Sequence, residues 1–214
     1  MATYLIGDVH GCYDELIAFA KKYNIVVIHD NAYADIIFDR EGTSFLKHEG
    51  AKEVGVEYYS LSKTFDLTGA RISFVLGNAK IVGMFRKLRS QIDYGVFYPI
   101  QDAAIAALNG PMDDVLKQQD EYLARNKALC GGLRSIGWDV PDSQGTMFVW
   151  APLPKGFDNS VEFVMELMEK AGVVFTPGSS FGSLGEGFVR MALVLDVPTI
   201  EKVIAAIKDS GILG

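Results

Sequence analysis

The sequence lacks the features typical of disulfide-stabilised, membrane-spanning and nucleic-acid-binding proteins. It has only two cysteines in 214 residues, Cys12 and Cys130, without the Cys-x-x-Cys spacing of metal or redox motifs. We therefore expect reduced thiols and a cytoplasmic protein rather than a disulfide framework. No apolar run approaches the roughly 18 residues of a membrane span. Lys and Arg form only short clusters and the net charge is −7, which argues against nucleic acid as a partner.

Hydrophobic residues make up 49% of the sequence, which is enough for a substantial core. Its start predicts a strand at residues 3–6, a Gly/Asp/His turn, a helix over Tyr13–Tyr23 and a strand at the run Ile25–Ile28. A continuous β-branched run is typical of a strand buried on both faces, as in parallel sheets covered by helices. The predicted fold class is α/β.

The rest of the chain alternates predicted strands and helices. Strands are expected at 56–61, 72–76, 146–150, 173–176 and 188–195, and helices at 79–92, 99–108, 112–137, 160–171 and 198–208. The long helix from Met112 is long enough to bridge two domains. We expect a large domain over residues 1–120 and a smaller α+β domain over 121–214.

Three segments carry a resemblance to a known family. They are "VIHDNAY" (27–33), "YYSLSKTFDLTGAR" (58–71) and "GFVRMAL" (187–193), supported by "PIQDAAIAALNGP" (99–111) and "FTPGSSFG" (175–182). Their order and spacing resemble the class I and II aminotransferases, which have fold type I and depend on pyridoxal 5'-phosphate (PLP). The resemblance runs from about Phe19 to the C-terminus. It implies part of the large PLP-binding domain, with a mostly parallel sheet covered by helices, followed by a smaller domain.

The resemblance assigns roles around the cofactor. Lys63 would form the Schiff base and move a proton. Asp30 would keep the pyridine nitrogen protonated, which makes the ring an electron sink, and its place at the carboxyl end of a strand is where open α/β sheets bind ligands. Tyr33 would hydrogen-bond the ring's phenolic oxygen.

The same resemblance assigns the phosphate and the substrate. Ser60 and Arg71, three residues before and eight after Lys63, match the family's phosphate-binding residues, with Ser62 as a weaker candidate. Arg190 matches the arginine that holds the substrate α-carboxylate. The implied small-molecule partners are an amino acid and a 2-oxo acid, with donors of the alanine, aspartate or LL-diaminopimelate type.

Each assignment has a structural alternative. Lys63 can equally be a solvated side chain after a strand, Arg190 an edge residue of a sheet, and Asp30 the cap of a turn or helix. The joint spacing of the segments favours the family.

Family members are about twice this long. The other half brings the aromatic residue that stacks on the ring, a helix N-terminus for the phosphate, an Asn-Pro-x-Gly segment and a tyrosine lent to the partner subunit. None of these is found here, so we expect reduced cofactor affinity and weak or absent transamination in a truncated form. The alternative is a folded, catalytically silent domain. Family enzymes are dimers, and an incomplete sheet exposes apolar surface, so we expect a homo-oligomer.

The first 18 residues, "MATYLIGDVHGCYDELIA", are similar instead to the start of symmetrical diadenosine tetraphosphate hydrolases, which are calcineurin-like metallophosphoesterases. In that family the residues matching Asp8 and His10 bind a metal of a two-metal site. The later metal-binding stretches are absent, because Gly77-Asn78 is followed by Ala79 and the chain has three histidines. We therefore expect no metal centre, place metal-dependent phosphoesterase activity a distant third, and interpret the chain as a join of two families.

Overall fold

In a computed structural model of the chain, the described residues are 3, 6, 9, 11–38 and 42–214. The chain divides into two compact units, one of residues 1–35 and 41–112 and the other of residues 36–40 and 113–214. The α/β class is confirmed. The sequence placed a boundary at residue 120, whereas the division falls at the start of the long helix and leaves all of that helix in the second unit. The strand predicted at 3–6 falls largely outside the described residues.

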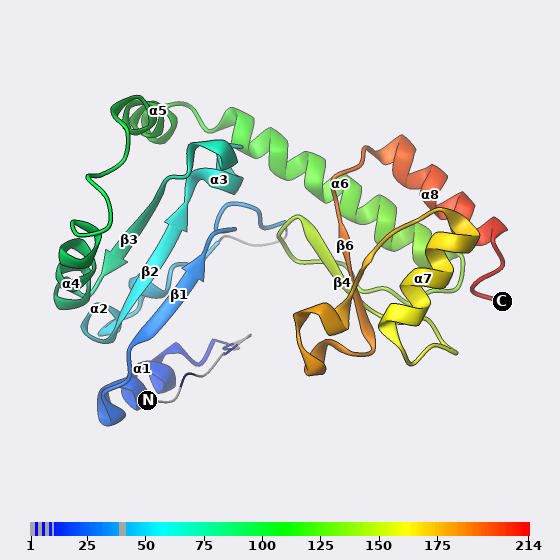
Figure 1. The fold of residues 1–214 in the computed structure, drawn as a ribbon, viewed down its shortest axis with the longest axis horizontal. Helices are drawn as coiled ribbons and strands as arrows, with labels where there is room; N and C mark the ends of the chain where they lie inside the picture. Colours follow the sequence, from blue (N-terminus) through cyan, green and yellow to red (C-terminus); the bar gives the residue numbers. More distant parts are fainter. Residues whose placement is uncertain (1–2, 4–5, 7–8, 10, 39–41) are drawn as a thin grey trace. The chain divides into compact units, whose positions relative to one another are not determined.

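The first unit has a three-stranded sheet with β2 at its centre (Figure 1). Its elements are α1 (Tyr13–Tyr23), β1 (Val27–Asn31), η1 (Phe45–Lys47), α2 (Ala51–Val54), β2 (Gly55–Ser60), α3 (Leu61–Thr64), η2 (Thr68–Ala70), β3 (Ser73–Gly77), α4 (Ala79–Arg89) and α5 (Tyr98–Asn109). β1 is parallel to β2, and β3 is antiparallel to it. The short link from Arg71 to Ser73 returns the chain directly beside β2.

The prediction that the first strand is buried on both faces is wrong. Val26 and Ile28 are 53% and 62% exposed, and β1 alternates between half-buried and exposed positions. Val27 packs on a cluster that includes Ile17 of α1 and Phe45 of η1. Helices therefore cover one face of β1, and the other face, at its carboxyl end, stays open.

Two apolar clusters hold the first unit together. One joins α1 to α2 and η1 through buried residues such as Ile17, Phe45 and Val54. The other joins the start of α3 to β3 and α5 through Leu61, Ile72 and Ala104. Fully burying a Val, Leu, Ile or Phe side chain contributes about 1.5–3 kcal/mol. The second cluster fixes the position of α3 at the end of β2.

The second unit has an antiparallel sheet in the order β4-β6-β5. Its elements are α6 (Asp113–Ser135), β4 (Phe148–Pro152), α7 (Ser160–Ala171), β5 (Thr176–Pro177), η3 (Gly178–Phe181), η4 (Ser183–Gly185), β6 (Phe188–Ala192) and α8 (Val197–Asp209). Val189 and Met191 face a core that contains Trp138 and Phe163, whose rings meet edge to face at 5.2 Å. Among the described residues, no helix is both long and apolar enough to cross a membrane.

Candidate functional site

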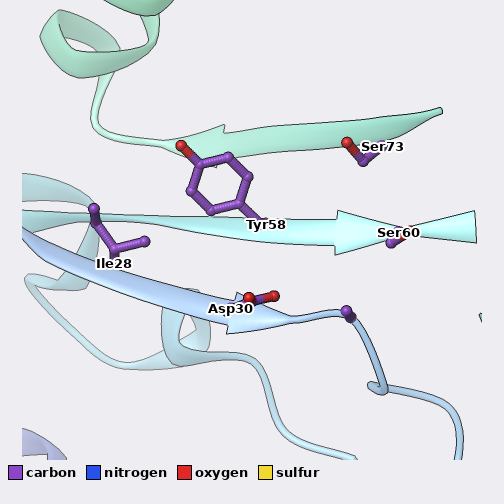
Figure 2. Close-up of a pocket in the computed structure, with 6 residues that line it drawn as sticks. Ile28, Asp30, Tyr58, Ser60 and Ser73 are labelled. Carbon is purple, nitrogen blue, oxygen red and sulfur yellow. The ribbon is translucent and has the colours of Figure 1, made fainter. Parts of the chain in front are cut away.

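Polar side chains from all three strands of the first unit meet at one end of its sheet (Figure 2). Asp30 on β1 lies opposite Tyr58 on β2, and Ser60 lies opposite Ser73 on β3. Because side chains alternate along a strand, Tyr58 and Ser60 point to the same face. This is the face of β1 that helices leave open. The alternative that Asp30 caps a turn or helix is wrong, because it lies within β1.

Two adjoining hollows occupy this face. The first, of about 330 Å³, is lined by Ile28, Asp30, Ala32, Tyr58, Ser60 and Ser73. The second, of about 560 Å³, is lined by Arg71, Val75, Tyr58 and Ser73, and by residues between Phe85 and Val96. Tyr58 and Ser73 line both hollows and separate them. Asp30 lines the first hollow and Arg71 lines the second. A carboxylate thus lies on one side and a guanidinium on the other, with serine hydroxyls between them.

The short helix α3 carries Ser62 and Lys63 away from the end of β2. Ser60 caps it, because the Ser60 Oγ accepts a hydrogen bond of 3.2 Å from the backbone N–H of Ser62. Lys63 is half-buried, and within residues 11–38 and 42–214 its amine has no hydrogen-bond or ion-pair partner. Neither Ser62 nor Lys63 is among the described residues that line the two hollows.

Asp35 braces the junction between β2 and α3. Its carboxylate accepts hydrogen bonds from the Tyr59 hydroxyl at 2.6 Å and the Thr64 hydroxyl at 2.8 Å. Burial, together with this carboxylate, raises the pKa of Tyr59 to about 12, so its hydroxyl remains a donor. Tyr33 lies half-buried in the turn between β1 and Asp35, outside the linings of both hollows.

The loop from Ser62 to Arg71 is closed by its own polar groups. The Thr68 hydroxyl donates to the Ser62 carbonyl at 2.9 Å, and the Arg71 guanidinium donates to the Thr68 carbonyl at 2.9 Å. Arg71 has a left-handed backbone with φ of 54° and an exposed side chain. Arg71 borders the larger hollow. The N–H groups of its guanidinium that do not bond to Thr68 could donate to an anion there.

Arg190 lies in the second unit on β6, the central strand of its sheet. The alternative that it is an edge residue is therefore wrong. Its guanidinium packs against the rings of Phe148 and Phe181. The opposite face of β6, with Val189 and Met191, is buried.

Sequence reasoning missed four residues of these two sites. Tyr58 and Ser73 line both hollows. For Tyr58 the two-residue period of a strand was the available signal, since it lies two positions before Ser60 on β2. Ser73 lies opposite Ser60 on β3, and that pairing is not contained in the local sequence. Phe148 and Phe181 had no comparable signal, because an isolated phenylalanine is typical of a core.

The resemblance of the first 18 residues to metallophosphoesterases is not tested by the structure at its two candidate metal ligands. Asp8 and His10 lie outside the described residues. In the part of the chain that is described, no three His, Cys, Asp or Glu side chains gather to hold a metal ion.

Comparison with known proteins gives matches along nearly the whole chain. The family model described as aminotransferase class I and II matches residues 12–207, which includes residues 12–18 of the segment first assigned to the phosphoesterase-like start. An LL-diaminopimelate aminotransferase of Halothermothrix orenii is 42% identical over 201 residues, covering 94% of this chain and 51% of that protein. An LL-diaminopimelate aminotransferase of Aquifex aeolicus is 42% identical over 188 residues, covering 87% of this chain and 48% of that protein.

Solved structures agree with these sequence matches. Substrate-bound BacF of Bacillus subtilis superposes with a TM-score of 0.90 and 36% identity, covering 96% of this chain and 52% of that chain. A probable N-succinyldiaminopimelate aminotransferase of Thermus thermophilus superposes with a TM-score of 0.87 and 32% identity, covering 96% of this chain and 55% of that chain. The chain spans about half the length of the curated relatives that it matches.

Proposed function

Because this chain belongs to the class I and II aminotransferases, we propose that it carries part of a PLP site for amino group transfer between an amino acid and a 2-oxo acid. PLP is the cofactor of this family. The observation that supports the proposal best is the pair of adjoining hollows, in which Asp30 and Ser60 border one and Arg71 borders the other. The donor set fits the cofactor, with an acid for the ring nitrogen and cationic and hydroxyl groups for the phosphate.

Each of these residues has a role in the proposal. Asp30 would pair with the protonated ring nitrogen and Tyr33 would donate to the ring's phenolic oxygen. Arg71 and Ser60 would bind the phosphate, with Ser62 as a weaker candidate. The amine of Lys63, on the short helix that follows Ser60, would hold the cofactor covalently and would carry the substrate proton. The bound cofactor supplies an electron sink for the substrate Cα.

Substrate binding is assigned to the second unit. Arg190 receives the α-carboxylate of the amino acid. The LL-diaminopimelate aminotransferases among the relatives favour a diaminopimelate-type donor. Since the chain spans about half the length of these relatives, we expect weak or no turnover from this polypeptide alone.

Trapping of the cofactor on the protein tests the proposal. PLP is added, the mixture is reduced with borohydride, and the labelled peptide is identified by mass spectrometry. We expect label at Lys63, loss of most label in Lys63→Ala, and unchanged labelling in the control Lys47→Ala, whose side chain is exposed on η1. Asp30→Asn should weaken PLP binding, measured by the visible absorbance of the adduct.

Equal labelling of several lysines, unaffected by Lys63→Ala, would contradict the proposal. The chain would then be the catalytically silent folded domain that the sequence left as an alternative.

A further inference from the structure

An arginine and a group of aromatic side chains gather on the open face of the β4-β6-β5 sheet. Phe188 and Arg190 lie two residues apart on β6, and Trp150 of β4 is directly opposite Arg190. Phe148 comes from the start of β4 and Phe181 from the end of η3. Since neighbouring strand positions alternate, the core-facing Val189 and Met191 leave this second face to the arginine and the rings.

Two of the rings contact the guanidinium directly. The Cζ atom of Arg190 lies 4.3 Å from the centre of the Phe148 ring and 4.5 Å from that of Phe181. Both distances are within the range of a cation–π contact. Trp150 contacts Phe181 edge to face at 5.6 Å and stacks on Phe188 at 5.5 Å. The ring of Phe181 is therefore itself held in place by a neighbour.

The Arg190 guanidinium contacts two aromatic rings but no hydrogen-bond acceptor in the described part of the chain. Among residues 11–38 and 42–214, the Arg190 guanidinium has no carboxylate partner and no hydrogen-bond acceptor. A guanidinium has five N–H donors, all in its plane, and it can pair with a carboxylate through two parallel hydrogen bonds. The contacts with the two rings involve no hydrogen-bond acceptor, so these donors remain available to a planar anion such as a carboxylate.

We propose that Phe148 and Phe181 are positioning residues for carboxylate binding by Arg190. They restrict the rotamers of the arginine side chain before the ligand arrives, which lowers the entropy cost of a two-hydrogen-bond contact. The inference rests on the proposed function, in which Arg190 receives the substrate carboxylate, and it adds the two residues that present it.

Trp150 provides a readout that needs neither cofactor nor turnover. The chain has two tryptophans. Trp138 is 1% exposed and donates from Nε1 to the Pro152 carbonyl at 2.8 Å, whereas Trp150 is 40% exposed beside Phe181. A ligand at Arg190 should therefore change the emission of Trp150 and leave that of Trp138 unchanged. Loss of the response in Trp150→Phe identifies its source.

The experiment is a fluorescence titration of the cofactor-free chain with propionate and with its neutral isostere propionamide. We expect a saturable response to propionate alone, abolished in Arg190→Gln. Phe148→Leu and Phe181→Leu should each weaken propionate binding about two- to fivefold, the loss expected for one cation–π contact. Phe148→Tyr and Phe181→Tyr keep a π face and should restore binding.

Phe188→Leu is the matched control, because this ring stacks on Trp150 and has no described contact with the guanidinium. It should change the emission spectrum and leave the propionate affinity unchanged. Should a leucine variant fail to fold, as judged by thermal melting, Phe→Met at the same position takes its place.

Wild-type affinity in both Phe→Leu variants, or an equal response to propionamide, would overturn the inference. The proposed function fails separately, in the labelling of Lys63, so the two results are distinguishable.

Discussion

At the scale of single residues, Glu57 is a buried carboxylate of the first unit with several polar partners. It lies on β2 and is 5% exposed. It accepts a hydrogen bond of 2.7 Å from the Ser44 hydroxyl and one of 3.2 Å from the Asn31 amide, and His29 Nδ1 lies 3.0 Å away. Burial by itself raises the pKa of Glu57, but the contacts with Ser44, His29 and Asn31 outweigh it, so the pKa is lowered.

The lowered pKa predicts a pH-dependent stability. A carboxyl whose pKa is lower in the folded chain stabilises it above the ordinary value of 4.5 and loses that effect as the pH falls through the folded value. Glu57→Gln should therefore reduce the free energy of unfolding at neutral pH by about 1.5–3 kcal/mol. It should also flatten the decline of stability toward acid, measured by urea unfolding across the acidic range.

Glu53→Gln is the control for this prediction. Glu53 is exposed and pairs with Lys21 at 3.0 Å, and such a surface pair contributes about 0–1 kcal/mol. Equal losses in the two variants would show that burial of the Glu57 network has no special effect.

Tyr59 gives a second prediction at this scale. Tyr59→Phe removes the shorter of the two hydrogen bonds by which Asp35 braces α3. We expect a loss of about 1.5–3 kcal/mol in the free energy of unfolding, since the acceptor is charged, and weaker PLP labelling of Lys63. Urea unfolding and the labelling experiment measure the two effects.

Tyr23→Phe is its control, because this ring lies exposed at the end of α1. We expect a change within about 0.5 kcal/mol. A wild-type stability for Tyr59→Phe would contradict the bracing role of Asp35.

At the scale of elements, helices were predicted more accurately than strands. α1 and α7 have the bounds expected from the sequence, because a helix leaves a 3.6-residue apolar pattern and distinct caps. The strand expected at 173–176 is only Thr176–Pro177, and that expected at 188–195 ends at Ala192. Strand ends depend on a partner strand, which local sequence does not contain.

The cap of α7 gives a prediction at this scale. The side-chain oxygen of Asn159 accepts hydrogen bonds from the backbone N–H groups of Val161 at 3.0 Å and Glu162 at 3.1 Å. Asn159→Ala leaves these donors without that acceptor and should reduce the free energy of unfolding by about 1 kcal/mol. Thermal or urea unfolding measures the loss.

Asp158→Ala changes the preceding, exposed residue and should alter stability by less than about 0.5 kcal/mol. The cap has no measurable role if the two variants unfold alike.

At the scale of the whole molecule, the segment between α4 and α5, together with the first residue of α5, exposes several large apolar side chains. Its exposed members are Ile92, Tyr94, Phe97 and Tyr98. Apolar side chains gathered in this way mark interaction surfaces. Together with the open face of β1, they support our proposal that the chain self-associates.

Sedimentation tests this proposal. We expect a species heavier than the 23.4 kDa chain at tens of micromolar protein. The double variant Tyr94→Ser, Phe97→Ser should shift the equilibrium toward monomer at least tenfold. Leu184→Ser, which removes an equally exposed apolar residue from the second unit, should not. A monomer in the unaltered chain would contradict the proposal.

The sequence by itself determined the α/β class, the family and the order of the elements. These follow from apolar periodicity and from the spacing of residues such as Asp30, Lys63 and Arg71, which are properties of the chain alone. Within the first unit it placed Asp30 and Ser60 at strand ends, where open α/β sheets bind ligands, but it did not indicate that Tyr58 and Ser73 line the same hollows.

Only the tertiary structure decided which faces are covered. The run at Ile25–Ile28 has the composition of a strand buried on both sides, yet Ile28 is exposed because helices pack on one face of β1. The rings around Arg190 come from β4 and η3, segments separated from it in sequence. Exposure and contacts of this kind depend on which segments meet in space, and that information is distributed over the whole fold rather than held in any local pattern.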